Sequence, residues 1–346
     1  MTKQYRFKHS LIYAVLITTF SSIAVQTNAK DFTGPIDVDQ ELEFTEDSTI
    51  KSEIWGPNTL VYTDGKKINL FTTNDSSLTI TSTYDPEVLA ENGGSISFKG
   101  FKDLSVSTGQ GVFEVKGVNS SIETDITGKL SLNSTNKGNF YLINSETGAS
   151  INLKAGDVIL SGAQAINNFG KTNITSGKDI VINTDGSNAI VNGGDGQIFL
   201  STKNKLYINN TGNAGNAIFL SGSGQLNATG AIVEVHATNN AIETSNSSSF
   251  NFGTADSRVG QLIIQGKNSG ISSQSSSQSN IYASDVSVLA TDDQGIAIYA
   301  GAGTLNLSAE TINVGSSKYM SIDISDLSAV NLLANQSVNI KSKGQA

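Results

Sequence analysis

Side chains that could do acid–base chemistry are few and far apart in this sequence. Beyond residue 29, His236 and Arg258 are the only histidine and the only arginine. A Ser–His–Asp hydrolase would have to use His236, yet no Gly-x-Ser-x-Gly sequence is present and abundant serine makes no single serine informative. Glu234 shares a strand face with His236, because side chains alternate along an extended strand. If Val233 and Val235 point inward, His236 points to solvent.

Carboxylate pairs, which glycosidases use as acid and base, are also scattered. Asp185 and Asp195 lie one turn apart within a single repeat, so a pair across a groove stays open as an enzymatic alternative. Asp256 and the Asp292-Asp293 pair fall in other repeats. With no Cys and a single His beyond residue 29, the usual zinc sites are excluded. We therefore predict no catalytic, cofactor-binding or metal-binding residue.

One short pattern recurs along the chain and organises the rest of it. A polar, a small and an apolar residue open the segment Asn216-Ala217-Ile218, and the pattern returns at Asn240-Ala241-Ile242. A segment that returns to its start so soon cannot bury its apolar side chains alone, so it must stack on copies of itself as a solenoid. The residues predicted to form one vertical apolar stack are Val112, Phe140, Ile166, Ile190, Ile218, Ile242, Ile271 and Ile296. Val61 and Val88 precede them and Ile322 follows, which predicts about eleven coils of about 26 residues.

Two further strands are predicted in each coil, because apolar and polar residues alternate there with strand periodicity. The second strands centre on residues 68–70, 96–98, 151–153, 198–200, 250–252, 305–307 and 330–332. The third strands centre on residues 104–106, 130–132, 180–182, 232–237, 286–288, 312–314 and 338–340. Asn188, Asn216 and Asn240 would stack at one corner and hydrogen-bond along the axis as an amide ladder. The sequence thus predicts an all-β, parallel β-helix of three short strands per coil, and the crossover preference of parallel strands favours a right-handed one.

The N-terminus has the features of a secretion signal. Lys3, Arg6 and Lys8 precede an apolar run, residues 11–20, that is too short to span a bilayer, and Thr27-Asn28-Ala29 offers small residues for cleavage. We therefore predict a signal peptide over residues 1–29 and an exported protein. Loss of these three positive charges takes the formal net charge from −9 to −12. Because such an acidic surface repels phosphate backbones, nucleic-acid binding is not expected.

Residues 30–58 differ from the coils in being rich in acidic residues. The segment also holds the only tryptophan, Trp55, together with Pro35 and Pro57. We predict an acidic N-terminal cap that covers the open strand edge of the first coil, with the β-helix over residues 59–346. A Ca2+ site at Asp37-Val38-Asp39 is the alternative for this segment.

A signal peptide, an acidic cap and Cys-free coils together resemble the passenger domain of a Gram-negative autotransporter. Residues 293–299 (Asp-Gln-Gly-Ile-Ala-Ile-Tyr) followed by Leu305-Asn306-Leu307 exemplify these coils. The resemblance covers roughly residues 55–340 and is closest to the non-proteolytic adhesin type. It implies a right-handed β-helix displayed on the outer surface of the cell. No translocator barrel pattern follows, so we expect either a fragment of a longer autotransporter or a passenger exported by a separate outer-membrane barrel.

The function expected from this resemblance is adhesion by a rigid surface rod. Its partners would be proteins or glycans on host or neighbouring bacterial cells. Self-association through an exposed C-terminal coil, around Val330–Leu333 and Val338–Ile340, is also expected. A carbohydrate-active β-helix enzyme and a purely structural stalk are the alternatives.

Overall fold

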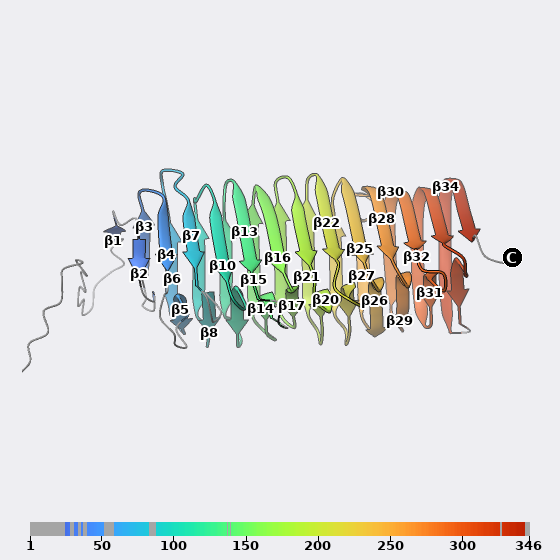
Figure 1. Cartoon of the computed structure of the whole chain (residues 1–346), viewed down its shortest axis with the longest axis horizontal. Helices are drawn as coiled ribbons and strands as arrows, with labels where there is room; N and C mark the ends of the chain where they lie inside the picture. The colour runs from blue at the N-terminus through green and yellow to red at the C-terminus, as the bar shows by residue number, and fades with distance from the viewer. Residues whose placement is uncertain are drawn as a thin grey trace, which may run out of the picture.

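The protein is an elongated rod made of β-strands and turns (Figure 1). This computed structural model describes residues 25–27, 31–33, 36, 40–51, 59–82, 88–136, 138, 140–325 and 327–342. Its fold is a parallel β-solenoid of about 11 turns with about 26 residues per turn, without a helix among these residues. The described ranges accordingly contain no helix that could cross a membrane. The predicted fold class and coil number are confirmed.

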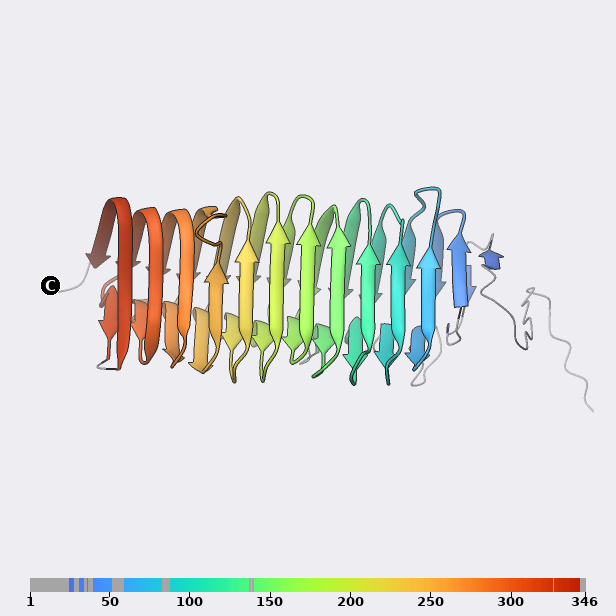
Figure 2. The same ribbon diagram turned by 180° about the vertical axis from the view of Figure 1, so that it is seen from behind.

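Each coil places one strand segment on each of three faces, and the strands lie across the rod axis (Figure 2). The first face is an 11-stranded parallel sheet of β5 (Val61–Asp64), β8 (Val88–Glu91), β11 (Phe113–Lys116), β14 (Tyr141–Ser145), β17 (Gln164–Asn168), β20 (Asn188–Asn192), β23 (Asn216–Leu220), β26 (Asn240–Asn246), β29 (Ser269–Ser275), β31 (Ile296–Ala300) and β33 (Ile322–Ile324). The second face holds β3 (Gln40–Phe44), β6 (Lys67–Phe71), β9 (Ser95–Lys99), β12 (Ser121–Asp125), β15 (Ser150–Ala155), β18 (Lys171–Ser176), β21 (Gln197–Thr202), β24 (Gln225–Thr229) and β27 (Ser249–Phe252). The third face holds β4 (Ser48–Lys51), β7 (Leu78–Thr81), β10 (Leu104–Thr108), β13 (Lys129–Ser134), β16 (Asp157–Gly162), β19 (Ile180–Thr184), β22 (Lys205–Asn210), β25 (Ile232–Ala237) and β28 (Val259–Gly266).

Toward the C-terminus, the second and third faces are joined by strands that cross their common corner. These strands are β30 (Gln278–Ala290), β32 (Gly303–Ser316) and β34 (Ser328–Ser342). They connect the two faces into one 23-stranded sheet. In β30, every second residue points inward within each of the two faces: Ile281 and Ala283 on the second face, and Val286 and Val288 on the third.

Inside the rod, the predicted apolar stack is present along the first face. Ile166, Ile190, Ile218, Ile242 and Ile271 are register partners on five adjacent parallel strands, and all are fully buried. Val61 and Val88 stand at the start of this column and Ile322 at its end, as predicted. The central five coils therefore have the register that the repeat indicated.

Three members of the predicted stack were wrong. The residue in register is Phe113 instead of Val112, Ile143 instead of Phe140, and Ile298 instead of Ile296. The reason is that two consecutive residues turn inward where the first strand begins, as Ala165-Ile166 and Ala297-Ile298 do. In one coil the first of this pair is the large Val112, so a search for a small residue followed by an apolar one stops at Gly111-Val112. Gly295-Ile296 satisfies the same search but lies just before the inward pair Ala297-Ile298. Phe140 instead lies outside the core and is 37% exposed.

The predicted second and third strands lie on the second and third faces. Their apolar residues alternate inward, with Ile68 paired to Ile96 on the second face and Leu104 paired to Leu130 on the third. A single cluster of buried apolar side chains runs from Ile36 to Val314. The column of apolar side chains is therefore continuous through the rod, as expected for coils that stabilise one another through their interfaces.

Parallel pairing begins before residue 59. Strands β3 and β4 are in register with β6 and β7, and they contribute Leu42, Phe44 and Ile50 to the core. The acidic segment therefore provides strands of the solenoid itself. Two shorter strands, β1 (Val25–Thr27) and β2 (Asp31–Thr33), pair with β3 and β4. Strand β1 falls within residues 1–29, whose assignment as a signal peptide remains a prediction.

Candidate functional site

His236 belongs to a small surface cluster on β22 and β25. Its inward neighbours Val233 and Val235 are fully buried, and its own side chain is 26% exposed, so it faces outward as predicted. The His236 Nε2 lies 3.5 Å from Glu234 Oε2, while Glu234 Oε1 lies 2.9 Å from Lys205 Nζ. Lys205 Nζ also sits 4.9 Å from the centre of the Tyr207 ring. Glu234 is therefore shared between a lysine and the histidine, which ties two neighbouring coils together on the third face.

Arg258 clamps one corner of the rod. Its Nη1 donates to the carbonyl oxygens of Ala283 at 3.1 Å and Ser308 at 2.9 Å, and its Nη2 donates to Ser308 Oγ at 3.1 Å. These acceptors lie on β30 and β32, in the next two coils. The guanidinium is thus engaged with backbone groups where the long strands cross the corner, and it stabilises three coils together.

Asp185 and Asp195 lie beyond opposite ends of strand β20. This five-residue strand is about 13 Å long at the usual rise, so the two carboxylates sit at different corners of one coil. Carboxyl pairs of glycosidases are separated by only about 5–10 Å. Asp195 accepts a hydrogen bond from Ser223 Oγ of the next coil. The structure therefore does not bring these two carboxylates together as the pair that the sequence left open.

The remaining acidic candidates are dispersed in the structure as well. Asp292 lies 3.6 Å from Lys267 Nζ in the preceding coil, and Asp293 pairs with Lys318 in the following coil. Asp256 is exposed in the loop before Arg258. No group of three or more His, Cys, Asp or Glu that could hold a metal ion occurs in the described part of the chain. Asp37 and Asp39, the alternative calcium ligands, lie outside the described residues.

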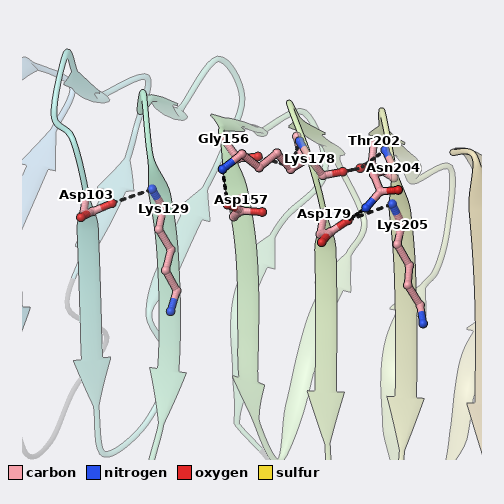
Figure 3. A network of polar contacts seen from close by, with 10 residues as sticks. Asp103, Lys129, Gly156, Asp157, Lys178, Asp179, Thr202, Asn204 and Lys205 are labelled. Carbon is pink, nitrogen blue, oxygen red and sulfur yellow. Dashed lines mark hydrogen bonds and ion pairs between the residues drawn. The ribbon is translucent and has the colours of Figure 1, made fainter.

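Carboxylates at the corner between the second and third faces have a structural task (Figure 3). Asp103 Oδ1 accepts the backbone N–H of Lys129 at 2.7 Å. Asp179 Oδ1 accepts the backbone N–H of Lys205 at 3.0 Å and the Asn204 side-chain amide at 2.8 Å. Each aspartate lies one coil before the lysine whose N–H it accepts. The two aspartates therefore satisfy the backbone N–H of the first residue of the strand in the next coil.

Tyr62 has a clearly raised pKa in the described part of the chain. The Tyr62 hydroxyl on β5 donates to Glu91 Oε1 on β8 at 2.5 Å. This hydrogen bond, with smaller contributions from desolvation and from the negative charges of Glu91 and Asp64, raises the pKa of Tyr62 to about 12. The pair links two coils of the first face, and in the described part of the chain it belongs to no group of three or more His, Cys, Asp or Glu side chains that could hold a metal ion.

The corner amide ladder was predicted with the wrong members. Asn268 Nδ2 donates to Asn239 Oδ1 at 2.6 Å, and Asn239 Nδ2 donates to Asn216 Oδ1 at 2.8 Å. The Asn240 amide turns instead to Glu243 Oε2, at 2.9 Å. A ladder thus passes through Asn216, but its next members are Asn239 and Asn268.

A longer amide ladder runs along the outer side of the second face. Each asparagine amide donates to the Oδ1 of its counterpart in the preceding coil. The ladder runs from Asn331 through Asn306, Asn280 and Asn251 to Asn227, at N–O distances of 2.8, 2.9, 2.9 and 2.9 Å. The four bonds connect five adjacent coils in one direction. Sequence reasoning missed this ladder, although its signal was present as the asparagine that recurs at the centre of second-strand triplets such as Leu305-Asn306-Leu307.

Comparison with protein-family models, with curated proteins and with solved structures finds no match for this chain. Its class therefore rests on the fold alone, a parallel β-solenoid that is compatible with an autotransporter passenger.

Proposed function

We propose that this chain is the exported, surface-displayed passenger of an adhesin from a Gram-negative bacterium. A rod of about 11 coils offers long, flat faces on which side chains repeat at each coil, and such faces suit attachment through many weak contacts. The observation that carries this proposal is the placement of the polar side chains, which join neighbouring coils and lie on the outer faces of the rod. Glu234, which neighbours His236, and also Arg258 and Asp195 contact neighbouring coils, and the long amide ladder lies on an outer face.

In this proposal, the signal peptide over residues 1–29 directs export through the inner membrane. An outer-membrane barrel, encoded in the same protein or supplied separately, carries the passenger to the cell surface. The binding partners are proteins or glycans of host cells or neighbouring bacteria. The functions that compete with this one are a carbohydrate-active enzyme and a structural stalk.

The test compares binding with catalysis on the same purified chain. Binding to epithelial and bacterial cells is measured in parallel with cleavage of neutral and acidic polysaccharides. We expect saturable cell binding that changes less than about threefold in the double variant His236→Ala, Arg258→Ala, because adhesion is spread over many contacts. Thermal unfolding of the variant is the control, since Arg258 also holds a corner, and His236→Ala alone is the second variant.

An enzyme gives the opposite result. Loss of an acid, a base or a charge-stabilising residue lowers the rate by at least about 100-fold. Polysaccharide cleavage that depends on Asp185, Asp195 or Arg258, without cell binding, would replace the adhesin by the enzyme. If the chain neither cleaves polysaccharide nor binds cells, the structural stalk is the function that remains.

A further inference from the structure

The second face of the rod divides into a charged part and an uncharged part. Each of its first six strands carries at least one charged outward side chain; one from each is Glu41, Lys67, Lys99, Glu123, Lys154 and Lys171. From β21 onward the described strands of this face carry none, as far as Tyr282 on β30 and Ser308 on β32. In an acidic protein with a formal net charge of −9, an uncharged region over several consecutive coils is a distinct surface.

We call the outward side chains of β24, β27 and the second-face parts of β30 and β32 the amide face. Their side chains are amides and hydroxyls, apart from the half-buried ring of Tyr282. The ladder asparagines occupy the centre of this face, and Gln225 and Gln278 lie exposed at its edge. Gln278 Nε2 also donates to Asn280 Oδ1 at 2.8 Å, which adds a bond within the coil to those between coils.

The ladder leaves hydrogen-bonding capacity on the outside. An asparagine amide has two N–H donors and an oxygen with two lone pairs. In Asn251 and Asn306, one N–H donates to the preceding coil and the oxygen accepts one bond from the following coil. One donor and one lone pair of each residue remain for a ligand. Because the ladder already fixes these side chains, a ligand that binds them loses less side-chain entropy than it would on free asparagines.

We propose that the amide face binds a neutral polysaccharide that lies extended along the rod axis. Sugar hydroxyls both donate and accept hydrogen bonds. The ladder amides offer a donor at each coil and, at Asn251 and Asn306, an acceptor as well. A sulfated or uronate polymer gains no ion pair from the outward side chains of this face, because none is charged and the neighbouring Arg258 is already engaged with Ala283 and Ser308. The acidic rest of the protein repels such a polymer. Repetition at the coil spacing of about 4.8 Å favours a polymer with repeated units over a compact ligand.

An aromatic ring borders the charged side of this face. Phe199 on β21 is 37% exposed, and Lys171 Nζ lies 5.7 Å from the centre of its ring. Exposed aromatic rings stack on the apolar C–H faces of sugars, so Phe199 provides an end contact for the chain of sugar units. This inference names a class of ligand for the proposed adhesin, so it rests on the proposed function.

The experiment places charge on the face without changing its shape. The double variant Gln225→Glu, Gln278→Glu adds two carboxylates to exposed positions of the amide face. The matched control, Gln261→Glu with Gln294→Glu, adds the same charge at exposed positions outside it. A second variant, Asn251→Leu, removes one ladder amide, and thermal unfolding shows whether each variant folds. Binding of each purified chain to a neutral mannan, a neutral β-glucan, polygalacturonate and heparin is measured alongside binding to cells.

We expect the wild type to bind at least one neutral polymer and neither charged one. The amide-face variant should bind that polymer at least about tenfold more weakly, while the control changes less than about twofold. Equal losses in variant and control would place the ligand elsewhere. If the chain binds cells but no neutral polymer, this inference is wrong and the proposed adhesin function still stands. If it binds neither cells nor a neutral polymer, the adhesin function is wrong as well.

Discussion

At the scale of the residue, asparagine takes different tasks according to the direction its side chain faces. Asn280 points outward and joins coils through the long ladder. Asn168 points inward and is fully buried, where its Nδ2 donates to Asn192 Oδ1 at 2.7 Å and its Oδ1 accepts from Thr172 at 2.9 Å. An amide is tolerated inside because the amide of the next coil and a nearby hydroxyl satisfy it. Composition alone therefore says little about what an asparagine does in this chain.

Tyr62 gives a prediction about alkaline pH. Its hydrogen bond to Glu91 raises the pKa of Tyr62 from 10.0 to about 12 in the folded protein. A raised pKa means that the folded state favours the protonated phenol, so the stabilisation is complete below pH 10 and is lost as the pH rises through about 12. Tyr62→Phe should therefore be less stable than the wild type below pH 10, and the difference should disappear above pH 12. Thermal unfolding of both proteins across this range measures it, and a constant difference would contradict the role of the pair.

At the scale of the element, the sequence was sufficient for the strands and insufficient for their exact register. Alternation identified the triplets of the second and third faces because an inward residue every second position is a direct consequence of strand geometry. The first strands were harder, since two consecutive residues such as Leu142 and Ile143 both turn inward. The outward contacts could not be predicted, because partners such as Lys205 and Glu234 are 29 residues apart and are brought together by the register alone.

Strand β23 allows the independence of the coils to be tested. Ile218 is fully buried between Ile190 and Ile242, whereas its neighbour Phe219 faces outward. Ile218→Asp buries a carboxylate without a partner and should cost at least about 3 kcal/mol. Limited proteolysis should then cut near residues 210–250 while distant coils stay protected, because coils couple only through their interfaces.

The matched control is Phe219→Asp, which places the same carboxylate on the outer side of the same strand. It should leave the protease pattern close to that of the wild type. Simultaneous loss of protection along the whole rod in Ile218→Asp would show that the coils unfold as one unit instead.

At the scale of the molecule, the last described coil has apolar side chains that no further coil covers in this structure. Val338 is 42% exposed and Ile340 is 54% exposed, although their counterparts Ile312 and Val314 in the preceding coil are buried. The difference arises because β34 pairs on one side with β32 and presents its other edge. An exposed strand edge of this kind templates pairing with another chain.

We therefore predict that the polypeptide ending at Ala346 associates with itself as its concentration rises. Asn339→Asp places a charge on the exposed edge and should reduce association by roughly tenfold, while Asn183→Asp, on the outer side of the third face, should not. Sedimentation over a range of concentrations distinguishes these outcomes. A wild-type chain that stays monomeric at high concentration would show that the edge is covered in solution.

The orientation of the strands across the rod has a mechanical consequence. Hydrogen bonds between coils run parallel to the long axis, so a pull on the two chain ends detaches coils one at a time from the ends of the rod instead of shearing all the interfaces together. Each coil that peels away removes about 4.8 Å of rod. It releases about 26 residues, which extend to about 90 Å of chain. Under tension the molecule would lengthen in steps and dissipate work at each step. It would therefore be a stiff rod at rest and an extensible tether under load.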